Sequence, residues 1–246
     1  MVSLVLFKKI DMPNLKNIIA LIHLGLIDPR LMQLSWNLRR TRRTYLSFAA
    51  LNSLAENFLS LNEHATQPLE VAEFGVGRGG SAMLLAWLVN KYHGQLYLFD
   101  VFSRIPAPTE QDGEQAKTRY ETIMSQESGE YYGNVPDLLV IVTSEIYKIC
   151  KPNSVEFVQG KYEEVLPKLG DQYKFSLVHI DCDWYESSVA VYKYLQNRLS
   201  PGAVIQVDDY SHWEGSRRAY QAAKWLKRYS THLVEGALVI DTSAPG

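Results

Sequence analysis

Acidic side chains follow two apolar runs of the sequence, at the point where each run ends. Asp181 and Asp183 come directly after the first run, and Asp208 and Asp209 come directly after the second. Because the carboxyl ends of parallel strands lie at one edge of a sheet, we expect these carboxylates to surround one pocket. Their mutual repulsion is relieved by a divalent cation with oxygen ligands. The sequence therefore predicts a metal site.

Magnesium is the cation that this set of donors favours. Carboxylate and water oxygens are hard ligands, and the chain has no His/Cys cluster of the kind that binds zinc. We predict Asp181, Asp208 and Asp209 as the ligands. Asp183 has less weight, because it could instead cap the helix that follows it.

A glycine-rich turn forms a second candidate site. The run GVGRGG from Gly75 satisfies G-x-G-x-x-G between an apolar strand at residues 69–74 and a helix that Ser81 would cap. Bare backbone and a helix N-terminus can hold a cofactor there. Glu73, just before the turn, would repel a pyrophosphate but attract the sulfonium and ammonium groups of S-adenosylmethionine. The pattern favours that cofactor over NAD.

Further residues fit a methyl transfer at this edge. Asp100 ends the next apolar run, where a ribose diol would be held by either cofactor. A cation would lower the pKa of an acceptor hydroxyl, and Asp181 is the predicted proton acceptor for in-line attack on the methyl group. His212 is a second candidate base, although it could belong to a surface turn. His179, inside an apolar strand, is expected to be a core histidine with its hydrogen bonds satisfied.

The elements that must position these residues alternate between strand and helix. This alternation predicts a doubly wound, mostly parallel, Rossmann-like α/β sheet, which a segment at residues 231–242 extends with closing edge strands to seven in all. Five parallel strands are expected at residues 69–74, 95–99, 155–159, 175–180 and 203–207, and helices near residues 81–92, 136–150, 162–169, 185–199 and 214–228.

Two segments lie outside this alternation. Residues 1–43 are predicted as an N-terminal helical extension, with a break at Pro29, that covers either the domain or, in the favoured interpretation, a second subunit. The domain itself is predicted over residues 44–246, opening with a helix from Thr44. Within it, residues 104–135 are long, polar and rich in Gly, Pro and Glu, which predicts a substrate lid or wall, with disorder as the alternative.

The composition excludes several classes of function. The chain has 246 residues, a net charge of −2 and 46% hydrophobic residues, as expected of one globular α/β domain without a general affinity for nucleic acid. Four arginines within residues 38–43 are interpreted as a solvated helix start rather than a phosphate site. The apolar stretch at residues 17–27 is too short to span a bilayer, and no good secretory signal is seen. Two cysteines outside any CxxC pair favour the cytoplasm.

Four motifs resemble those of a known family. They are EFGVGRGG from Glu73, DCDWYES from Asp181, VDDY ending at Tyr210 and GSRRA from Gly215. They are similar to E-x-G-V-x-R-G-G, D-G-D-x-Y-E-S, V-D-D-Y and G-x-R-x-A of the metal-dependent sugar O-methyltransferases typified by macrocin O-methyltransferase and its mycinamicin and novobiocin pathway relatives. The resemblance extends from Thr44 to the C-terminus.

The resemblance implies S-adenosylmethionine and magnesium as cofactors, a hydroxyl on a small molecule as acceptor, and a dimer. It implies that Asp181, Asp208 and Asp209 bind the metal and that Asp181 is the base. Cys182 stands where the family usually has glycine, and Gly77 stands where it often has tryptophan. The match at residues 101–106 is loose. The resemblance therefore says more about the chemistry than about the substrate. Implied cofactor contacts are Thr44, Tyr45, Glu73, Gly75, Arg78, Ser81, Asp100, Gly160, Tyr162 and Asp181.

The favoured function is thus methylation of a hydroxyl of a secondary metabolite, with its sugar as the favoured acceptor. A catechol or other phenol is an alternative acceptor, since neighbouring oxygens could also chelate the metal. An NAD-dependent oxidoreductase would use the same turn but gives the paired acids no role. A non-catalytic interaction module would use the N-terminal helix and the arginine run, and predicts that Asp208 and Asp209 are dispensable.

Overall fold

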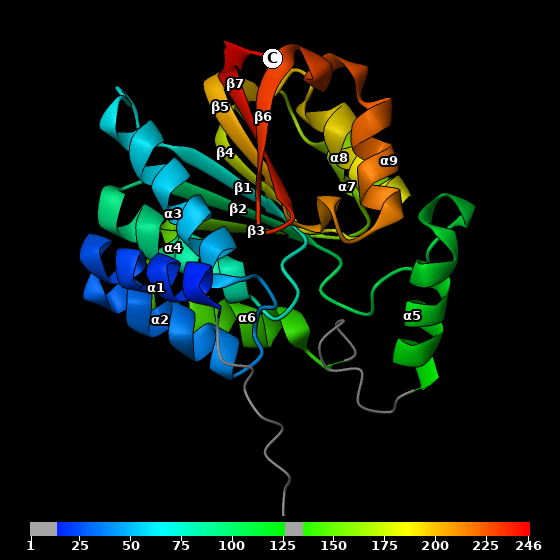
Figure 1. Ribbon diagram of the computed structural model, residues 1–246, viewed down its shortest axis with the longest axis horizontal. Helices are drawn as coiled ribbons and strands as arrows, with labels where there is room; N and C mark the ends of the chain where they lie inside the picture. The colour runs from blue at the N-terminus through cyan, green and yellow to red at the C-terminus, as the bar shows by residue number, and fades with distance from the viewer. Residues whose placement is uncertain (1–13, 126–134) are drawn as a thin grey trace, which may run out of the picture.

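The protein is built on one seven-stranded sheet, seen in a computed structural model that describes residues 14–125 and 135–246 (Figure 1). The strand order is β3-β2-β1-β4-β5-β7-β6, and only β7 runs antiparallel to its neighbours. The predicted doubly wound, mostly parallel sheet is confirmed. The strands are β1 (Glu70–Phe74), β2 (Gln95–Asp100), β3 (Val155–Gln159), β4 (Phe175–Ile180), β5 (Leu199–Val207), β6 (Tyr229–Val234) and β7 (Ala237–Pro245).

Helices cover both faces of the sheet. Figure 1 shows α1 to α4 and α6 on one face and α7 to α9 on the other, with α5 standing apart beyond α9. Within β1, Val71 joins the core under the first group while Phe74 joins the core under the second, as buried parallel strands require. The helices are α1 (Leu15–Ile27), α2 (Pro29–Arg40), α3 (Phe48–Glu63), α4 (Gly80–Tyr92), α5 (Gly113–Ser125), α6 (Leu138–Ile146), α7 (Tyr162–Val165), α8 (Tyr185–Leu195) and α9 (Glu214–Ala222).

Several predicted element boundaries are wrong for local reasons. The helix expected from Thr44 begins at Phe48, because Ser47 is extended and its side chain accepts a hydrogen bond from the N–H of Ala50. Ser81 does not cap α4 but lies inside it, and the N-cap is Gly79. β5 begins at residue 199, which shortens the helix predicted over 185–199, and the pattern at 214–228 divides into α9 and a 3-10 segment.

The described part of the interval at residues 104–135 is more regular than a loop. A 3-10 turn (Glu110–Asp112) leads into α5, and residues 126–134 lie outside the described residues. Thr109 and Asp112 form a reciprocal capping box at the turn, which stabilises its start. Residues 110–125 of the segment predicted as a lid or wall are therefore helical.

α1 has two apolar faces. Ala20 and Leu24 are buried against the domain, whereas the opposite side of the helix carries exposed leucine and isoleucine side chains. A helix with apolar residues on an exposed face has surface available for a partner. No helix within the described ranges is both long and apolar enough to cross a bilayer. The exposed side chains of α1 are Leu15, Ile18, Ile19, Ile22 and Leu26.

Candidate active site

A large cavity lies over the carboxyl ends of the parallel strands. Its volume is about 1430 Å³, and both the glycine-rich turn and the two acid pairs line it. Parallel strands end at this edge, which is where ligands bind in doubly wound sheets. The predicted site residues that line it are Thr44, Tyr45, Gly75, Arg78, Ser81, Asp100, Tyr162, Asp181, Asp208 and Asp209.

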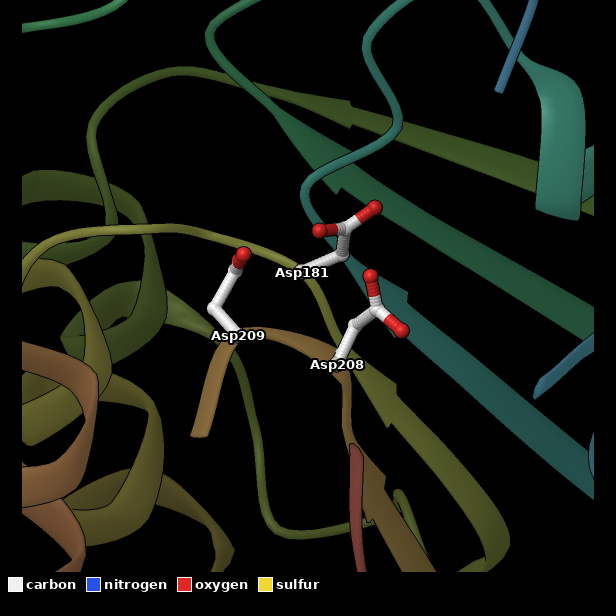
Figure 2. A group of neighbouring side chains, drawn as sticks. All are labelled: Asp181, Asp208 and Asp209. Carbon is white, nitrogen blue, oxygen red and sulfur yellow. The ribbon is translucent and has the colours of Figure 1, made fainter. Parts of the chain in front are cut away.

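The three aspartates Asp181, Asp208 and Asp209, here called the acidic triad, approach one another closely. One carboxylate oxygen from each lies within 4.8 Å of the others. Figure 2 shows Asp181 leaving the end of one strand and Asp208 and Asp209 leaving the next, with the side chains around a common space. Asp181 follows β4, and the other two begin a 3-10 turn after β5.

The electrostatics of the triad show repulsion between its members. Burial raises the pKa of Asp181 well above its ordinary value, and the charge of Asp208 raises it further. Burial also raises the pKa of Asp209, with the charges of Asp183 and Asp181 as further causes. Carboxylates in this arrangement ionise together only when a cation lies between them. The donor set therefore fits a hard divalent cation.

Asp183 is next to the triad but has other partners. Its backbone N–H donates to Oδ2 of Asp209 at 3.3 Å, and its Oδ1 accepts from the indole of Trp213 at 2.8 Å. Burial raises its pKa to about 6. The alternative that Asp183 caps α8 is wrong, because the first N–H of that helix, on Tyr185, donates instead to Asp112 at 2.6 Å.

The first glycine of the turn brings two strand ends together. Gly75 has φ +92°, and a Cβ on it would lie 1.9 Å from the carbonyl oxygen of Asp181. The N–H of Asp181 donates to the carbonyl of Phe74 at 2.8 Å. A Cβ on Gly77 would meet no atom of residues 14–125 and 135–246 within 4 Å, so the backbone there faces open space in the described part of the chain. The turn therefore holds bare backbone beside the base of the acidic triad.

Asp100 organises the turn. Its Oδ2 accepts the N–H groups of Val76 at 2.6 Å and Gly77 at 2.9 Å, and its Oδ1 accepts that of Phe102 at 2.6 Å. Burial raises the pKa of this carboxyl, and the three N–H donors oppose that effect. The residue lines the cavity. In addition to the predicted ribose contact, it fixes the shape of the glycine-rich turn.

Glu73 lies beneath the turn rather than at its mouth. Its side chain is fully buried, because position 73 of β1 faces α3 and α4. Oε1 accepts the hydroxyl of Ser81 and lies 2.9 Å from Nδ1 of His179. Glu73 therefore does not line the cavity, although the sequence predicted it as a cofactor contact.

His179 is part of a buried ion pair. Burial alone would lower its pKa, but the hydrogen bond and charge of Glu73 raise it to about 9. Nε2 of His179 and Oε2 of Glu73 have no hydrogen-bond partner among the residues that the structure describes. The prediction of a satisfied core histidine is thus only half right. The strand register could have indicated the pair, since the two residues are directly opposite on β1 and β4.

The other predicted residues divide between the cavity and its support. Tyr162 is buried and its hydroxyl donates to the carbonyl of Phe99 at 3.1 Å. Gly160 does not line the cavity; its N–H donates to the carbonyl of Asp100 at 3.0 Å. His212 lines the cavity beside Trp213, with ring centroids 4.5 Å apart.

Sequence reasoning missed part of the lining. Lys161, Trp213 and Glu235 come from segments without a chemical motif, so only the fold brings them to the cavity. Arg43, interpreted as part of a solvated helix start, also lines it.

Comparison with known proteins agrees with this geometry. A curated relative from Streptomyces olivaceus, 8-demethyl-8-(2,3-dimethoxy-alpha-L-rhamnosyl)-tetracenomycin-C 4'-O-methyltransferase, is 26% identical over 188 residues, which are 75% of this chain and 68% of the relative. The structure of the O-methyltransferase NovP matches with a TM-score of 0.67 at 18% identity, covering 81% of both chains. That of CalS11, a calicheamicin methyltransferase, matches with a TM-score of 0.62 at 18% identity, covering 92% of this chain and 91% of its own.

The family assignment rests on the sequence model for Macrocin-O-methyltransferase (TylF), which matches residues 44–240. This range includes the glycine-rich turn and the acidic triad. The chain belongs to the macrocin-O-methyltransferase (TylF) family and is an S-adenosylmethionine-dependent O-methyltransferase.

Proposed function

We propose that the protein uses magnesium to methylate a hydroxyl on the sugar of a natural product. The observation that carries the proposal is that the acidic triad and the glycine-rich turn line one cavity. The name of the tetracenomycin relative, which acts on a rhamnosyl compound, supports a sugar as the acceptor. Antibiotic biosynthesis is the setting that this family and this relative indicate.

In this proposal the acidic triad holds the metal. When bound between these carboxylates, a divalent cation would neutralise them and would lower the pKa of an acceptor hydroxyl. Asp181 accepts the proton of that hydroxyl, because it belongs to the triad and its backbone contacts Gly75 of the turn that faces the methyl donor. The support is the close approach of the triad to the turn.

The turn and its surroundings bind the cofactor. Asp100 holds the ribose hydroxyls with its remaining lone pairs, and backbone at Gly77 faces the ligand. Glu73 acts from beneath, through Ser81, as a buried negative charge below the sulfonium. The remaining contacts we propose are Thr44, Tyr45, Gly75, Arg78, Gly160, Tyr162 and Asp181, with Gly160 acting through Asp100.

The organisation of the chain follows the same proposal. Residues 44–246 correspond to the methyltransferase domain and residues 1–43 to the N-terminal extension, whose described part, from residue 14 on, carries α1 and α2. The described part of the insertion at residues 104–135 forms a wall for the acceptor. The exposed apolar face of α1 supports a homodimer. Both cysteines are free, which supports a cytoplasmic enzyme.

A mass-spectrometric screen tests the acceptor and the metal together. Glycosylated and phenolic compounds are incubated with the enzyme and a methyl-labelled cofactor, with and without EDTA. We expect label on the sugar of a glycoside, and its loss in EDTA with recovery on adding excess Mg²⁺. Label that persists in EDTA excludes the metal role, and label on phenols alone excludes the sugar.

A further inference from the structure

Helix α8 has no cap from its own sequence neighbours. It begins directly after the segment at residues 181–184, and its N-cap residue, Trp184, makes no side-chain hydrogen bond to the first turn. The first N–H groups of a helix need acceptors. The N–H of Tyr185 donates at 2.6 Å to Oδ1 of Asp112, 73 residues earlier in the chain. The cap of α8 therefore comes from the insertion.

Asp112 is held by both of its oxygens. Oδ2 accepts from the backbone N–H of Thr109 at 2.7 Å and from its hydroxyl at 3.0 Å. The residue is only 1% exposed, although it has a charged side chain. Buried carboxylates are stable when hydrogen-bond donors satisfy them, and charge-assisted bonds are the stronger kind. An amide cannot replace this group, because its nitrogen cannot accept the hydrogen bonds that Thr109 or Tyr185 donates.

Other contacts join the same parts of the chain. The indole of Trp184 donates to the carbonyl of Pro106 at 2.9 Å, and its ring packs against Trp213 at 5.2 Å between centroids. Gly215, near the start of α9, leaves room for Asp112, since a Cβ there would lie 1.9 Å from Oδ1. The insertion, α8 and α9 therefore meet at one carboxylate.

This junction is continuous with the acidic triad. We call residues 105–122, which contribute to the cavity lining, the insertion wall, and residues 181–185 the ligand loop. Within the ligand loop, Asp183 donates to Asp209 and accepts from Trp213, while Asp181 is itself a triad member. A displacement of Tyr185 would therefore shift the triad as well, because only a few backbone residues separate Tyr185 from Asp181.

We propose that Asp112 is a positioning residue that fixes the insertion wall to the ligand loop. This inference rests on the proposed function, because the wall is taken to hold the acceptor and the loop to hold the metal. The hydrogen bonds of Asp112 go to Thr109 and Tyr185 and not to the triad. Its role is to keep the acceptor surface and the reacting centre in one fixed relation.

Hydrogen exchange of the full-length protein tests the coupling without an acceptor. In Asp112→Asn we expect amide exchange to quicken by about tenfold both in peptides covering residues 105–112 and in those covering 183–188, and to stay unchanged at residues 70–81. A simple helix cap would change only residues 183–188, and that result, or no change in either segment, overturns the proposal. Glu110→Gln, an exposed acid in the same 3-10 turn, is the matched control and leaves both segments unchanged.

Binding and kinetics separate this proposal from the proposed function. Asp112→Asn is expected to bind S-adenosylhomocysteine within about twofold of wild type, while the KM of the acceptor found in the screen rises about tenfold and that of the cofactor does not change. Equal acceptor KM values for the two proteins overturn the positioning role. If Asp112→Asn does not fold, Thr109→Val, which removes one donor to Oδ2, gives a smaller change in the same directions. Wild-type protein that fails to bind S-adenosylhomocysteine contradicts the proposed function, and the exchange experiment still decides the role of Asp112.

Discussion

At the residue scale, the site is a set of buried and half-buried carboxyl groups that differ in their hydrogen-bond partners. Asp100 has three backbone donors, whereas the members of the acidic triad mainly repel one another. A carboxylate whose hydrogen bonds are satisfied within the protein serves structure as well as binding. A carboxylate without such donors is available to bind a ligand. Replacing a carboxylate by its amide should therefore have different effects in the acidic triad and at Asp100.

Asp209→Asn should lower turnover by at least about a hundredfold, because one ligand of the proposed metal loses its charge. The same change should raise the melting temperature in EDTA, since it relieves the repulsion that raises the pKa of Asp181 and Asp209. Glu63→Gln, an exposed acid at the end of α3, is the control and should alter neither. Full activity with a lower melting temperature would contradict a metal role for the triad.

Asp100→Asn should weaken binding of S-adenosylhomocysteine by about tenfold or more, as measured by calorimetry. An amide has one acceptor oxygen, so it cannot accept both from Val76 and Gly77 and from Phe102, and the glycine-rich turn loses part of its support. The affinity for Mg²⁺ should stay the same, because Asp100 is not a member of the triad. Unchanged cofactor affinity would show that the turn keeps its shape without the carboxylate.

At the element scale, the ends of β1 and β4 are in contact at one glycine. The carbonyl of Asp181 occupies the space that any side chain at residue 75 would need, and the N–H of Asp181 bonds to β1. The two strand ends, one leading to the cofactor turn and the other to the triad, therefore keep a fixed spacing. Gly77, two residues later, has free space around it.

Gly75→Ala should cost about 2 kcal/mol or more of unfolding free energy and abolish turnover, because the new methyl group displaces Asp181. Gly77→Ala is the matched control: it has a positive φ of +49° but no clash, so only about 1 kcal/mol of left-handed strain is expected. Urea unfolding and the methyl-transfer assay measure both effects. Equal costs for the two variants would exclude close approach as the reason for glycine at position 75.

At the scale of the whole molecule, stability depends on charges buried in the centre of the sheet. Glu73 and His179 lie opposite each other on adjacent strands and are both fully buried. Gln206 continues this row of polar residues on β5. The folded state therefore binds the His179 proton more tightly than the unfolded chain does, which links stability to pH.

The unfolding free energy in EDTA should fall as the pH rises from about 6.5 to about 9, by up to about 3 kcal/mol. The sign follows from the raised pKa of His179: its contribution is complete below the unfolded pKa of 6.5 and is lost as the pH passes the folded value of about 9. Denaturant titrations across this range measure the slope. The double variant Glu73→Gln/His179→Gln, which removes both charges, should flatten it, and an unchanged slope would exclude the pair as its cause.

Substitutions on α1 test whether its exposed apolar face forms the proposed dimer interface. Sedimentation should give a dimer for the wild type and a monomer with the same circular dichroism for Ile22→Glu/Leu26→Glu, because both side chains lie on the exposed apolar face. Val140→Glu, at an exposed apolar position of α6, should remain a dimer. A wild-type monomer, or a double variant that stays dimeric, would show that this face is not the interface.

The fold and the chemistry of the edge were predictable from the sequence because they depend on local patterns. Alternating apolar strands and helices indicated the parallel sheet, and acids placed directly after strands had to reach its carboxyl edge. Asp208 and Asp209 are therefore close to Asp181 in space although 26 or more residues separate them in the chain. The glycine pattern likewise indicated where bare backbone would lie.

The partners of individual side chains were decided by the tertiary structure. Position 73 of β1 turns toward the helices, so Glu73 is buried with His179 rather than open to the cavity. Asp112, within a segment interpreted as a lid, caps α8 from 73 residues away, a contact that no periodicity could indicate. The sequence determines which groups reach the edge of the sheet because strand direction is a local property. Which groups pair there depends on how distant segments pack, and only the folded chain decides that.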